Sequence, residues 1–456
     1  MAQEALRGSI PEDVAVSPLS GNNIHSHGPF HARESLIRPN NPEYAEVLRI
    51  SKSVISATAG LDLTRRREGK RFIIDGYAYR PRRSEVNDQI TGEEAIESFW
   101  ANVKRIDEIG LPNLPSEWHS IRGGQLALAV YLTEEQKVAS GRRKTPYDQY
   151  LEATSGFEPR LIPWRDLGKN YDQVCDILDD MGEKADWKNE LSVRAVIQRR
   201  NKTTLIQSKE EIETAFRLYD KRNRRKLLPI LGNEVDNVKF DFKWEETNEF
   251  WRFWETIGPN GERDLRSNWH ERHRDRYDRG TIEMYAGHEP EHYVWFALIT
   301  KGINEHRIDP AAGLIAIPGP NAFQLEGLAQ TIGDLAEYYL GHDGQLAVAL
   351  YRMEKRAQVN GLYRVEEGAS IEEAAQEIRK YMPLTNLEEI KRLLREGTEK
   401  PFERAYLPTY GMSDYGLMTL RGEVQGINAM LPYWHSVPLT PDQFLNPPLG
   451  QLVKYE

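Results

Sequence analysis

The sequence predicts a mainly α protein with a large multi-helix body, one or two small β-hairpins, and extended N- and C-terminal arms. Three observations support this fold class. Helix-start signals recur along the chain, each followed by apolar residues at the three- and four-residue spacing of an amphipathic helix. Strand-like patterns are confined to short segments. Both ends of the 456-residue chain are interrupted by prolines, which exclude regular helices there.

Composition places the chain among folded proteins that need no oxidising compartment. It contains 10 Trp, 21 Tyr and 13 Phe, which is too many aromatic residues for a disordered chain. No apolar run is long enough to span a membrane, and the first residues show no signal-peptide pattern. Cys175 is the single cysteine, so a disulfide framework within the chain is excluded. We therefore expect a cytoplasmic protein that does not bind membranes.

The N-terminal half is predicted to contain an arm followed by a helical lobe. Residues 1–41 form the arm, because prolines and glycines interrupt every stretch that could become a helix. The lobe covers residues 42–235, and its first helix ends near Gly60. Residues 71–79 are rich in β-branched and aromatic side chains, which predicts a small hairpin near residues 61–80.

Capping signals mark the start of four predicted helices. In each, Ser or Thr is followed three residues later by Glu, which is the spacing of a capping box. The four pairs are Thr91 and Glu94, Ser208 and Glu211, Ser370 and Glu373, and Thr385 and Glu388. Apolar residues at helical spacing follow each pair, so helices are expected at all four places.

Residues 236–431 are predicted to form a second helical lobe. Residues 238–244 alternate between apolar and polar side chains, which predicts a short strand. Residues 245–257 are predicted as a helix crowded with aromatic side chains, which would serve as a core or subunit anchor. These aromatic residues are Phe250, Trp251, Phe253 and Trp254.

Residues 432–456 are predicted to form a Pro-rich extended C-terminal arm. Its five prolines exclude a regular helix, yet it carries large apolar side chains that need a surface to cover them. We expect a groove on another copy of the chain to provide that surface. The predicted subunit-interface residues are Tyr433, Trp434, Phe444 and Leu445.

One octapeptide occurs twice, at residues 124–131 and 344–351, with six of its eight positions identical. Duplication of a helical unit is one explanation. The alternative is that two buried helices independently need small apolar residues on one face. The sequence leaves this choice open.

The net charge of −10 is spread unevenly and leaves two basic segments. Residues 61–83 contain 8 basic and 3 acidic residues, and residues 199–226 contain 10 basic and 4 acidic residues. Either segment could contact the phosphates of RNA or DNA, or could be an ordinary solvated surface. The candidate nucleic-acid contacts are Arg65, Arg66, Arg67, Lys70, Arg71, Arg82, Arg83, Arg199, Arg200, Arg222, Arg224 and Arg225.

Residues 288–292, His-Glu-Pro-Glu-His, match the His-Glu-x-x-His pattern of zinc metalloproteases. In that pattern two histidines one helical turn apart bind zinc, and the glutamate activates a water molecule. Pro290 argues against it, because proline inside a helix removes a hydrogen bond and clashes with the preceding turn. Glu291 adds a charge where such helices are normally apolar. We therefore expect Pro290 to begin a helix with His288 outside it, and we predict no metal site, no cofactor and no catalytic residue.

Two other segments could carry chemistry. His25, His27 and His31 could offer three imidazoles to a metal, but an ordinary loop is expected there. Residues 266–279 contain five arginines and two histidines between aromatic residues, a composition that can contact phosphates and stack on bases. Acids in the same stretch could instead pair with those arginines in a solvated or interface helix. No Gly-rich phosphate loop or nucleophile elbow is present.

Three classes of function are consistent with these features. The first is a self-assembling viral or phage coat subunit held together by exchanged arms, with copies of itself and packaged nucleic acid as partners. The arms, the segregated charge and the high aromatic content favour this class. The second is an RNA-wrapping nucleoprotein. The third is a mostly α enzyme whose active site is built from residues distant in sequence.

Overall fold

The structure, a computed structural model, describes residues 42–249, 251–338 and 341–448. Within these ranges the chain forms 17 α-helices and five short β-strands, so the predicted mainly α fold is confirmed. The helices are α1 (Pro42–Arg67), α2 (Gly92–Ile109), α3 (Glu117–Ala139), α4 (Tyr147–Ser155), α5 (Trp164–Asp180), α6 (Glu190–Thr204), α7 (Lys209–Leu231), α8 (Glu234–Asn237), α9 (Glu271–Arg274), α10 (Arg279–Asn304), α11 (Asn321–Leu335), α12 (His342–Glu366), α13 (Ile371–Ile378), α14 (Leu387–Glu399), α15 (Pro401–Glu423), α16 (Leu431–Trp434) and α17 (Pro441–Leu445). The strands are β1 (Ile74–Tyr77), β2 (Asp241–Glu245), β3 (Phe253–Ile257), β4 (Arg263–Asn268) and β5 (Leu314–Ala316).

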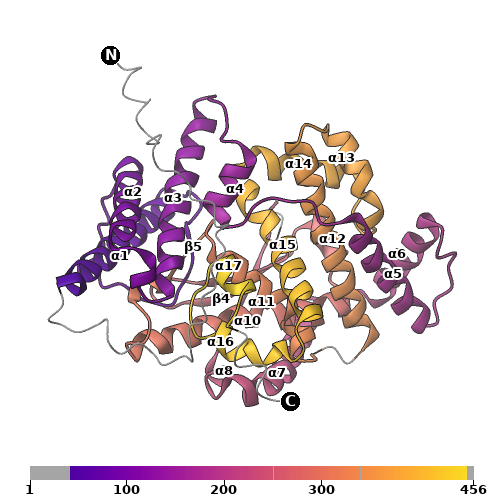
Figure 1. Ribbon diagram of the computed structural model, residues 1–456. Coiled ribbons are helices and arrows are strands. Elements are labelled where there is room, and N and C mark those ends of the chain that lie inside the picture. The colour runs from indigo at the N-terminus through magenta and orange to yellow at the C-terminus, as the bar shows by residue number, and fades with distance from the viewer. Residues whose placement is uncertain (1–41, 250, 339–340, 449–456) are drawn as a thin grey trace.

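The helices surround a central group that includes α10, α11 and α15. Figure 1 shows α1, α2 and α3 at one end of the molecule and α5 and α6 at the other. None of the helices in the described ranges combines the length and the apolar character needed to cross a membrane. The predicted division into two helical lobes, residues 42–235 and 236–431, stays a prediction.

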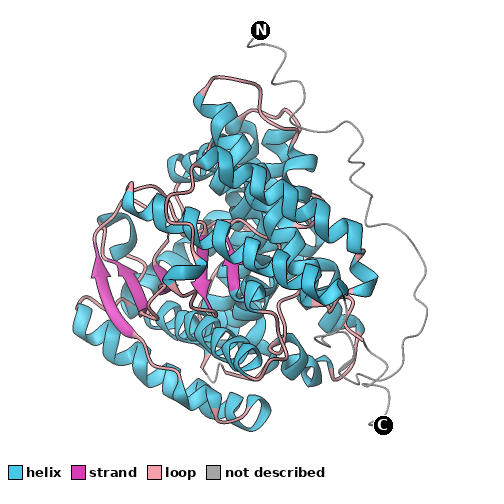
Figure 2. Cartoon of the chain, turned by 90° about the vertical axis from the view of Figure 1, so that its left-hand side faces the viewer, coloured by secondary structure: helices cyan, strands magenta, loops and turns pink. Residues whose placement is uncertain are grey.

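The five strands form one mixed sheet in the order β2-β4-β3-β1-β5. β3 pairs antiparallel with β4 and parallel with β1, and β5 closes one edge antiparallel to β1. Figure 2 shows this sheet as a small part of a body made mostly of helices. Gly76 of β1 allows α10 to lie close to the sheet, because a Cβ atom added there would lie 2.3 Å from the ring of Phe296. The central strands β1 and β3 therefore lie beside α10.

Helix α10 runs through the core of the molecule. Its first turn is capped by Asp278, whose side chain accepts a hydrogen bond from the Thr281 backbone amide at 3.0 Å. The helix contacts α7, α11, α12 and β3, and nearly all of its residues are buried. A helix covered on all sides in this way can place polar side chains in the interior, where they require specific partners.

Three of the four predicted helix starts are confirmed at the predicted residue. Thr91 and Ser370 form capping boxes with Glu94 and Glu373, and the Ser208 side chain accepts from the Glu211 amide. The fourth differs by one residue, because Asn386 caps α14. The predicted strand at residues 238–244 corresponds to β2.

No hairpin forms at residues 61–80. Residues 61–67 continue α1, and β1 pairs with β3 and β5 instead of with a neighbouring strand in sequence. The composition of residues 71–79 therefore correctly predicted a strand. The strands that pair with it, β3 and β5, lie far along the chain.

The predicted helix at residues 245–257 does not form, because Phe253 and Trp254 belong to strand β3. Trp251 and Trp254 pack edge to face with ring centroids 6.3 Å apart, and Phe253 packs against Phe216 at 5.4 Å. This strand is covered on both faces, so its aromatic residues follow one another without alternation. Phe250 lies outside the described residues.

The part of the C-terminal segment that the structure describes packs on the chain's own core. Trp434 and Phe444 are fully buried, and the Trp434 Nε1 donates a hydrogen bond to the Phe444 carbonyl at 3.2 Å. Tyr433 and Leu445 are partly buried against the same core. The side chains predicted to need a neighbouring copy are thus covered within this chain. The remainder of the arm, residues 449–456, and the N-terminal arm, residues 1–41, lie outside the described residues.

Candidate metal centre

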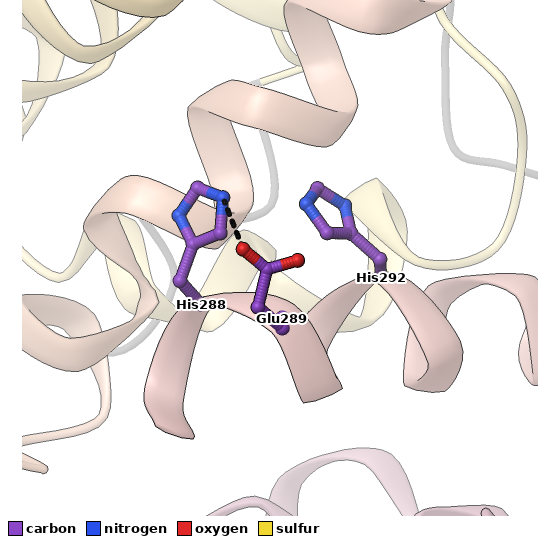
Figure 3. Close-up of side chains that lie close together, drawn as sticks. All are labelled: His288, Glu289 and His292. Atoms are coloured by element: carbon purple, nitrogen blue, oxygen red, sulfur yellow. Dashed lines mark ion pairs between the residues drawn. The ribbon is translucent and has the colours of Figure 1, made fainter. Parts of the chain in front are cut away.

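Helix α10 carries two histidines and a glutamate on one buried face. His288 and His292 are one turn apart, so their side chains project in the same direction. Figure 3 shows the carboxylate of Glu289 between the two imidazole rings. One ligand atom from each of these three residues lies within 4.8 Å of the others, and all three residues are buried. This is the arrangement that a His-Glu-x-x-His helix uses to bind a metal.

The expectation that Pro290 begins the helix is wrong, because α10 starts at Arg279 and continues through the proline. A proline at position 290 has no N–H to offer the carbonyl of Ala286, one turn earlier. Asn223 of α7 replaces that donor, since its side-chain Nδ2 donates to the Ala286 carbonyl at 3.2 Å. His288 is therefore held inside the helix.

Glu291 has a separate partner and does not belong to the metal-binding face. Its Oε1 pairs with the Nε2 of His435, and both residues are buried. The other ring nitrogen of His435, Nδ1, lies 2.6 Å from the Leu431 carbonyl at the start of α16. The Glu291 side chain, which argued against a buried helix, thus has a hydrogen-bond partner in the C-terminal segment.

Helix α11 supplies a carboxylate opposite the histidines. The Oε2 of Glu326 lies 3.4 Å from the His288 Nε2. Its Oε1 accepts a hydrogen bond from the Tyr406 hydroxyl at 2.5 Å, and the Tyr410 hydroxyl donates to Tyr406 at 3.3 Å. Both tyrosines come from α15, which therefore orients Glu326. Two histidines and a glutamate are a ligand set of zinc hydrolases.

The central strands place two more carboxyl groups beside the histidines. Glu255 of β3 has its Oε2 3.9 Å from the His292 Nε2, and Asp75 lies on the adjacent strand β1. Burial, followed by the charges of Glu326 and Glu289, raises the pKa of Asp75 to about 8. Burial also raises the pKa of Glu289 to about 7 and that of Glu255 well above its ordinary value. A bound divalent cation would supply the positive charge that these crowded carboxyl groups need.

The two histidines differ in protonation. Burial lowers the pKa of His292 to about 3, which leaves it as a neutral imidazole with a lone pair for a metal. For His288 burial acts in the same direction, but the hydrogen bond with Glu326 and the nearby carboxylates outweigh it and raise the pKa. Burial acts to raise the pKa of Glu326, but the hydrogen bond and charge of His288 outweigh it and lower the pKa. Metal binding would therefore displace a proton from the pair of His288 and Glu326.

A small cavity opens beside His288. It is lined by Met284, Gln330 and Tyr351, among others. Both amide atoms of Gln330 are buried and have no hydrogen-bond partner among the described residues. The ring of Tyr351 lies 6.3 Å from the His288 ring and also lines two larger cavities. The cavity has a volume of about 10 Å³, which is room for one water molecule at most.

Most of the basic residues predicted to contact nucleic acid are paired with acids of the chain itself. These ion pairs join Arg65 to Glu135, Arg66 to Asp62, Lys70 to Glu68, Arg71 to Glu249 and Glu403, Arg199 and Arg200 to Glu183, Arg222 to Glu283, and Arg224 to Asp220. Arg67, Arg82, Arg83 and Arg225 make no ion pair with any residue in the described ranges. Contact with RNA or DNA stays a prediction.

The remaining candidate segments have little part in this centre. Residues 266–279 contain the end of strand β4, the short helix α9 and the first residue of α10. Arg272 of α9 pairs with Glu389 at 2.5 Å. Cys175 is buried, as a structural cysteine would be. His25, His27 and His31 lie outside the described residues.

Comparisons with known proteins identify a shared fold. No family profile and no curated protein matches the chain. The solved structures that resemble it include two that are each described as a putative lipoprotein. The one from Colwellia psychrerythraea has a TM-score of 0.53 and 13% identity, with 81% of this chain and 65% of that chain aligned. The one from Shewanella oneidensis, described as of unknown function, has a TM-score of 0.50 and 13% identity, with 78% and 72% aligned.

These similarities contradict the prediction of a viral or phage coat subunit. Neither similar structure is described as a coat protein. One feature that favoured the coat was a C-terminal arm with uncovered apolar side chains, and the described part of that arm is covered by the chain's own core. About a third of the Colwellia chain lies outside the alignment, and the low identity establishes a likeness in fold alone.

Proposed function

We propose that this protein is a zinc-dependent hydrolase that cleaves amide bonds in peptides. The observation that carries the proposal is that His288, Glu289 and His292 place ligand atoms within 4.8 Å of one another, with the Glu326 carboxylate 3.4 Å from His288. The first two residues and Glu289 share one helix face, and Glu326 is brought in by a separate helix. Buried ionisable groups with shifted pKa values that meet in this way are typical of catalytic sites.

In this proposal, the imidazole Nε2 atoms of His288 and His292 and the carboxylate of Glu326 hold the zinc ion. A zinc ion in such a site lowers the pKa of a water molecule and polarises a substrate carbonyl. Tyr406 keeps Glu326 in place through the hydrogen bond to its Oε1. The buried surroundings exclude bulk water, which strengthens the electrostatic interactions within the site.

Glu289 is assigned as the general base. It accepts a proton from water as the water oxygen bonds to the substrate carbonyl carbon. The same proton then passes to the leaving nitrogen as the carbon–nitrogen bond breaks, so the products are a carboxylic acid and an amine. A carboxyl group whose pKa is raised to about 7 is suited to both transfers near neutral pH.

The metal site is tested by equilibrium dialysis against zinc followed by metal analysis. We expect one zinc ion per chain in the wild type and a loss of affinity of about 100-fold or more in His292→Ala. His342→Ala, at the exposed start of α12, is the matched control and should bind zinc like the wild type. A wild-type chain that takes up no zinc would refute the site.

The hydrolytic role is tested with the zinc-loaded protein and a mixture of fluorogenic peptides. Glu289→Gln should retain zinc and lower the rate of hydrolysis by about 100- to 10,000-fold. Zinc binding by the wild type without hydrolysis of any peptide would leave the metal site standing and refute the hydrolase.

A further inference from the structure

A cavity lined by basic side chains shares Tyr351 with the small cavity beside His288. It has a volume of about 80 Å³, which is room for a few water molecules or one small anionic group. Four cationic and two carboxylate side chains line it, giving a net charge of +2: Arg252, Arg272, Arg276 and Lys355 against Glu354 and Glu389. Burial lowers the pKa of its histidine, His273, to about 3, so that residue adds no charge at neutral pH.

The two acids of the cavity are already paired. Arg272 pairs with Glu389 at 2.5 Å, and Arg276 lies 3.9 Å from Glu354. Arg252 and Lys355 make no ion pair within 4.0 Å with any described carboxylate. The positive charge that remains in the cavity therefore belongs to these two side chains.

Aromatic rings, instead of carboxylates, hold these two cations. The Arg252 guanidinium lies over the ring of Tyr285 at 5.3 Å, and the Lys355 ammonium lies over the ring of Tyr410 at 4.4 Å. Both side chains are only partly exposed, so part of their hydration is lost. Burial and the charge of Arg252 lower the pKa of Lys355 to about 8, as expected for a cation without a counter-ion.

The same rings connect the cavity to the metal centre. The ring of Tyr285 lies 6.0 Å from the ring of His288. Tyr410 donates to Tyr406, which donates in turn to Glu326. Tyr351 lines both this cavity and the smaller cavity beside His288, so the two cavities meet at that side chain. An anion bound by Arg252 and Lys355 would therefore lie near the metal ligands.

We propose that Arg252 and Lys355 form a subsite for a carboxylate of the substrate, namely the C-terminal carboxylate of a short peptide. This inference rests on the proposed function. Arginine binds a carboxylate through two parallel hydrogen bonds, and lysine adds a point charge. A chain end is favoured over the middle of a polypeptide because His288, Glu289 and His292 are each at most 5% exposed. A long chain cannot pass through a site that is closed in this way.

The test is a calorimetric titration of the zinc-loaded protein with two probes. Benzylsuccinate carries two carboxylates, one for the metal and one for the subsite, and 3-phenylpropanoate lacks the second. We expect the wild type to bind benzylsuccinate about 10- to 100-fold more tightly than 3-phenylpropanoate. Arg252→Met and Lys355→Met should each remove most of that preference and leave binding of 3-phenylpropanoate unchanged.

Two control variants each replace an exposed arginine or lysine by methionine, so that each removes one positive charge from the surface. Arg165→Met and Lys104→Met, whose side chains are 81% and 79% exposed, should keep the wild-type preference. Circular dichroism checks that every variant is folded, and either of the two cavity variants is sufficient for the test. Equal binding of the two probes by the zinc-loaded wild type would overturn the subsite without affecting the metal site, whereas failure to bind zinc would overturn the proposed function itself.

The source of the carboxylate is tested by hydrolysis of matched peptides. Tetra-alanine with a free C-terminus should be cleaved at least about tenfold faster than its C-terminal amide. Restored cleavage of an amidated peptide that carries a glutamate side chain would show that the subsite reads side chains, and would overturn the assignment to the chain end.

Discussion

The Asn223 side-chain amide donates a hydrogen bond to the carbonyl of Ala286, at 3.2 Å. This is the carbonyl that Pro290 leaves without a partner in α10. The contact joins α7 to α10 and allows a helix that contains proline to keep His288 and His292 on one face. Asn223, a residue from a distant segment, therefore allows the His-Glu-x-x-His residues to form a continuous helix with both histidines on one face.

Replacement of Asn223 by leucine tests this relationship. The change keeps the approximate size of the side chain but leaves the buried Ala286 carbonyl unsatisfied, so we expect it to lower the free energy of unfolding by about 1–3 kcal/mol. Urea denaturation of the protein measures the loss.

The same change in a Pro290→Ala background is the control. Alanine restores an N–H at position 290, so the Ala286 carbonyl regains its partner within the helix and Asn223→Leu should cost clearly less. Equal losses in the two backgrounds would show that Asn223 stabilises the protein by some other contact.

The sequence contained the His-Glu-x-x-His pattern, but local rules placed the start of its helix at the wrong residue. Proline inside a helix is costly, and this argued against a helix through residues 288–292. The compensation comes from Asn223, which has no spacing relationship to the motif. Likewise, the buried Glu291 has a hydrogen-bond partner, His435, in the C-terminal segment. Such compensation exists only in the folded chain.

The fold prediction was accurate where an element depends on residues close together in the sequence and failed where it depends on distant ones. Helix caps at Thr91, Ser208 and Ser370 were predictable because a cap involves residues only three apart. The strand β3 was not, because its aromatic residues resemble those of a buried helix and only its pairing with β4 and β1 distinguishes the two.

Glu326 and Tyr406 could not be placed in the site from the sequence, because they come from helices far from residues 288–292. One signal was available for Glu326. It is the one charged residue in residues 321–333 of α11, and a buried acid needs a partner or a metal. That signal shows that Glu326 needs a partner in the folded protein, but it does not show which side chains contact it.

Tyr406→Phe tests whether α15 supports the metal ligand. The variant removes the hydroxyl that donates to Glu326 at 2.5 Å and leaves the ring in place. Zinc affinity should fall by about 10- to 100-fold, as is typical when the partner of a metal ligand is lost. Equilibrium dialysis measures the change.

Tyr410→Phe, one turn along the same helix, is the control and should have a smaller effect, because its hydroxyl contacts Tyr406 and not Glu326. A larger effect for Tyr410→Phe would contradict the assigned order of the contacts.

Asp414 is predicted to be the main electrostatic link between α12 and α15. Its two carboxylate oxygens pair with Arg352 at 2.8 Å and Arg356 at 2.7 Å, and it is 1% exposed. Asp414→Asn leaves the buried Arg356 without its counter-charge and Arg352 with Asp334 alone, so it should lower the free energy of unfolding by about 3–5 kcal/mol. Asp334→Asn, which removes a more exposed partner of Arg352, should cost about 1 kcal/mol or less.

The stabilisation from Asp414 should depend on pH in a defined direction. Burial acts to raise the pKa of Asp414, but Arg352 and Arg356 outweigh it and hold the pKa below its ordinary value. A lowered carboxyl pKa stabilises the folded state above the ordinary pKa near 3.9, and this stabilisation is lost as the pH falls through the folded-state pKa. The difference in unfolding free energy between wild type and Asp414→Asn should thus be constant from about pH 8 to 5 and shrink below about pH 4. A difference that grew on acidification would contradict the ion pairs.

For Asp75 we expect the opposite pH dependence of stability in the metal-free protein. Its pKa is raised to about 8, first by burial and then by Glu326 and Glu289. A raised carboxyl pKa means that the folded state holds a proton the unfolded chain has already released, so stability is lost as the pH rises from about 4 to about 8. In the presence of a chelator, the unfolding free energy of the wild type should therefore decrease over this range, and Asp75→Asn, which carries no charge at any pH, should decrease less. Zinc should reduce the wild-type decrease, because the bound cation compensates the carboxylates. If the chelated wild type and Asp75→Asn lost stability in parallel, the carboxyl groups would not be crowded in the way that makes this centre a site for a cation.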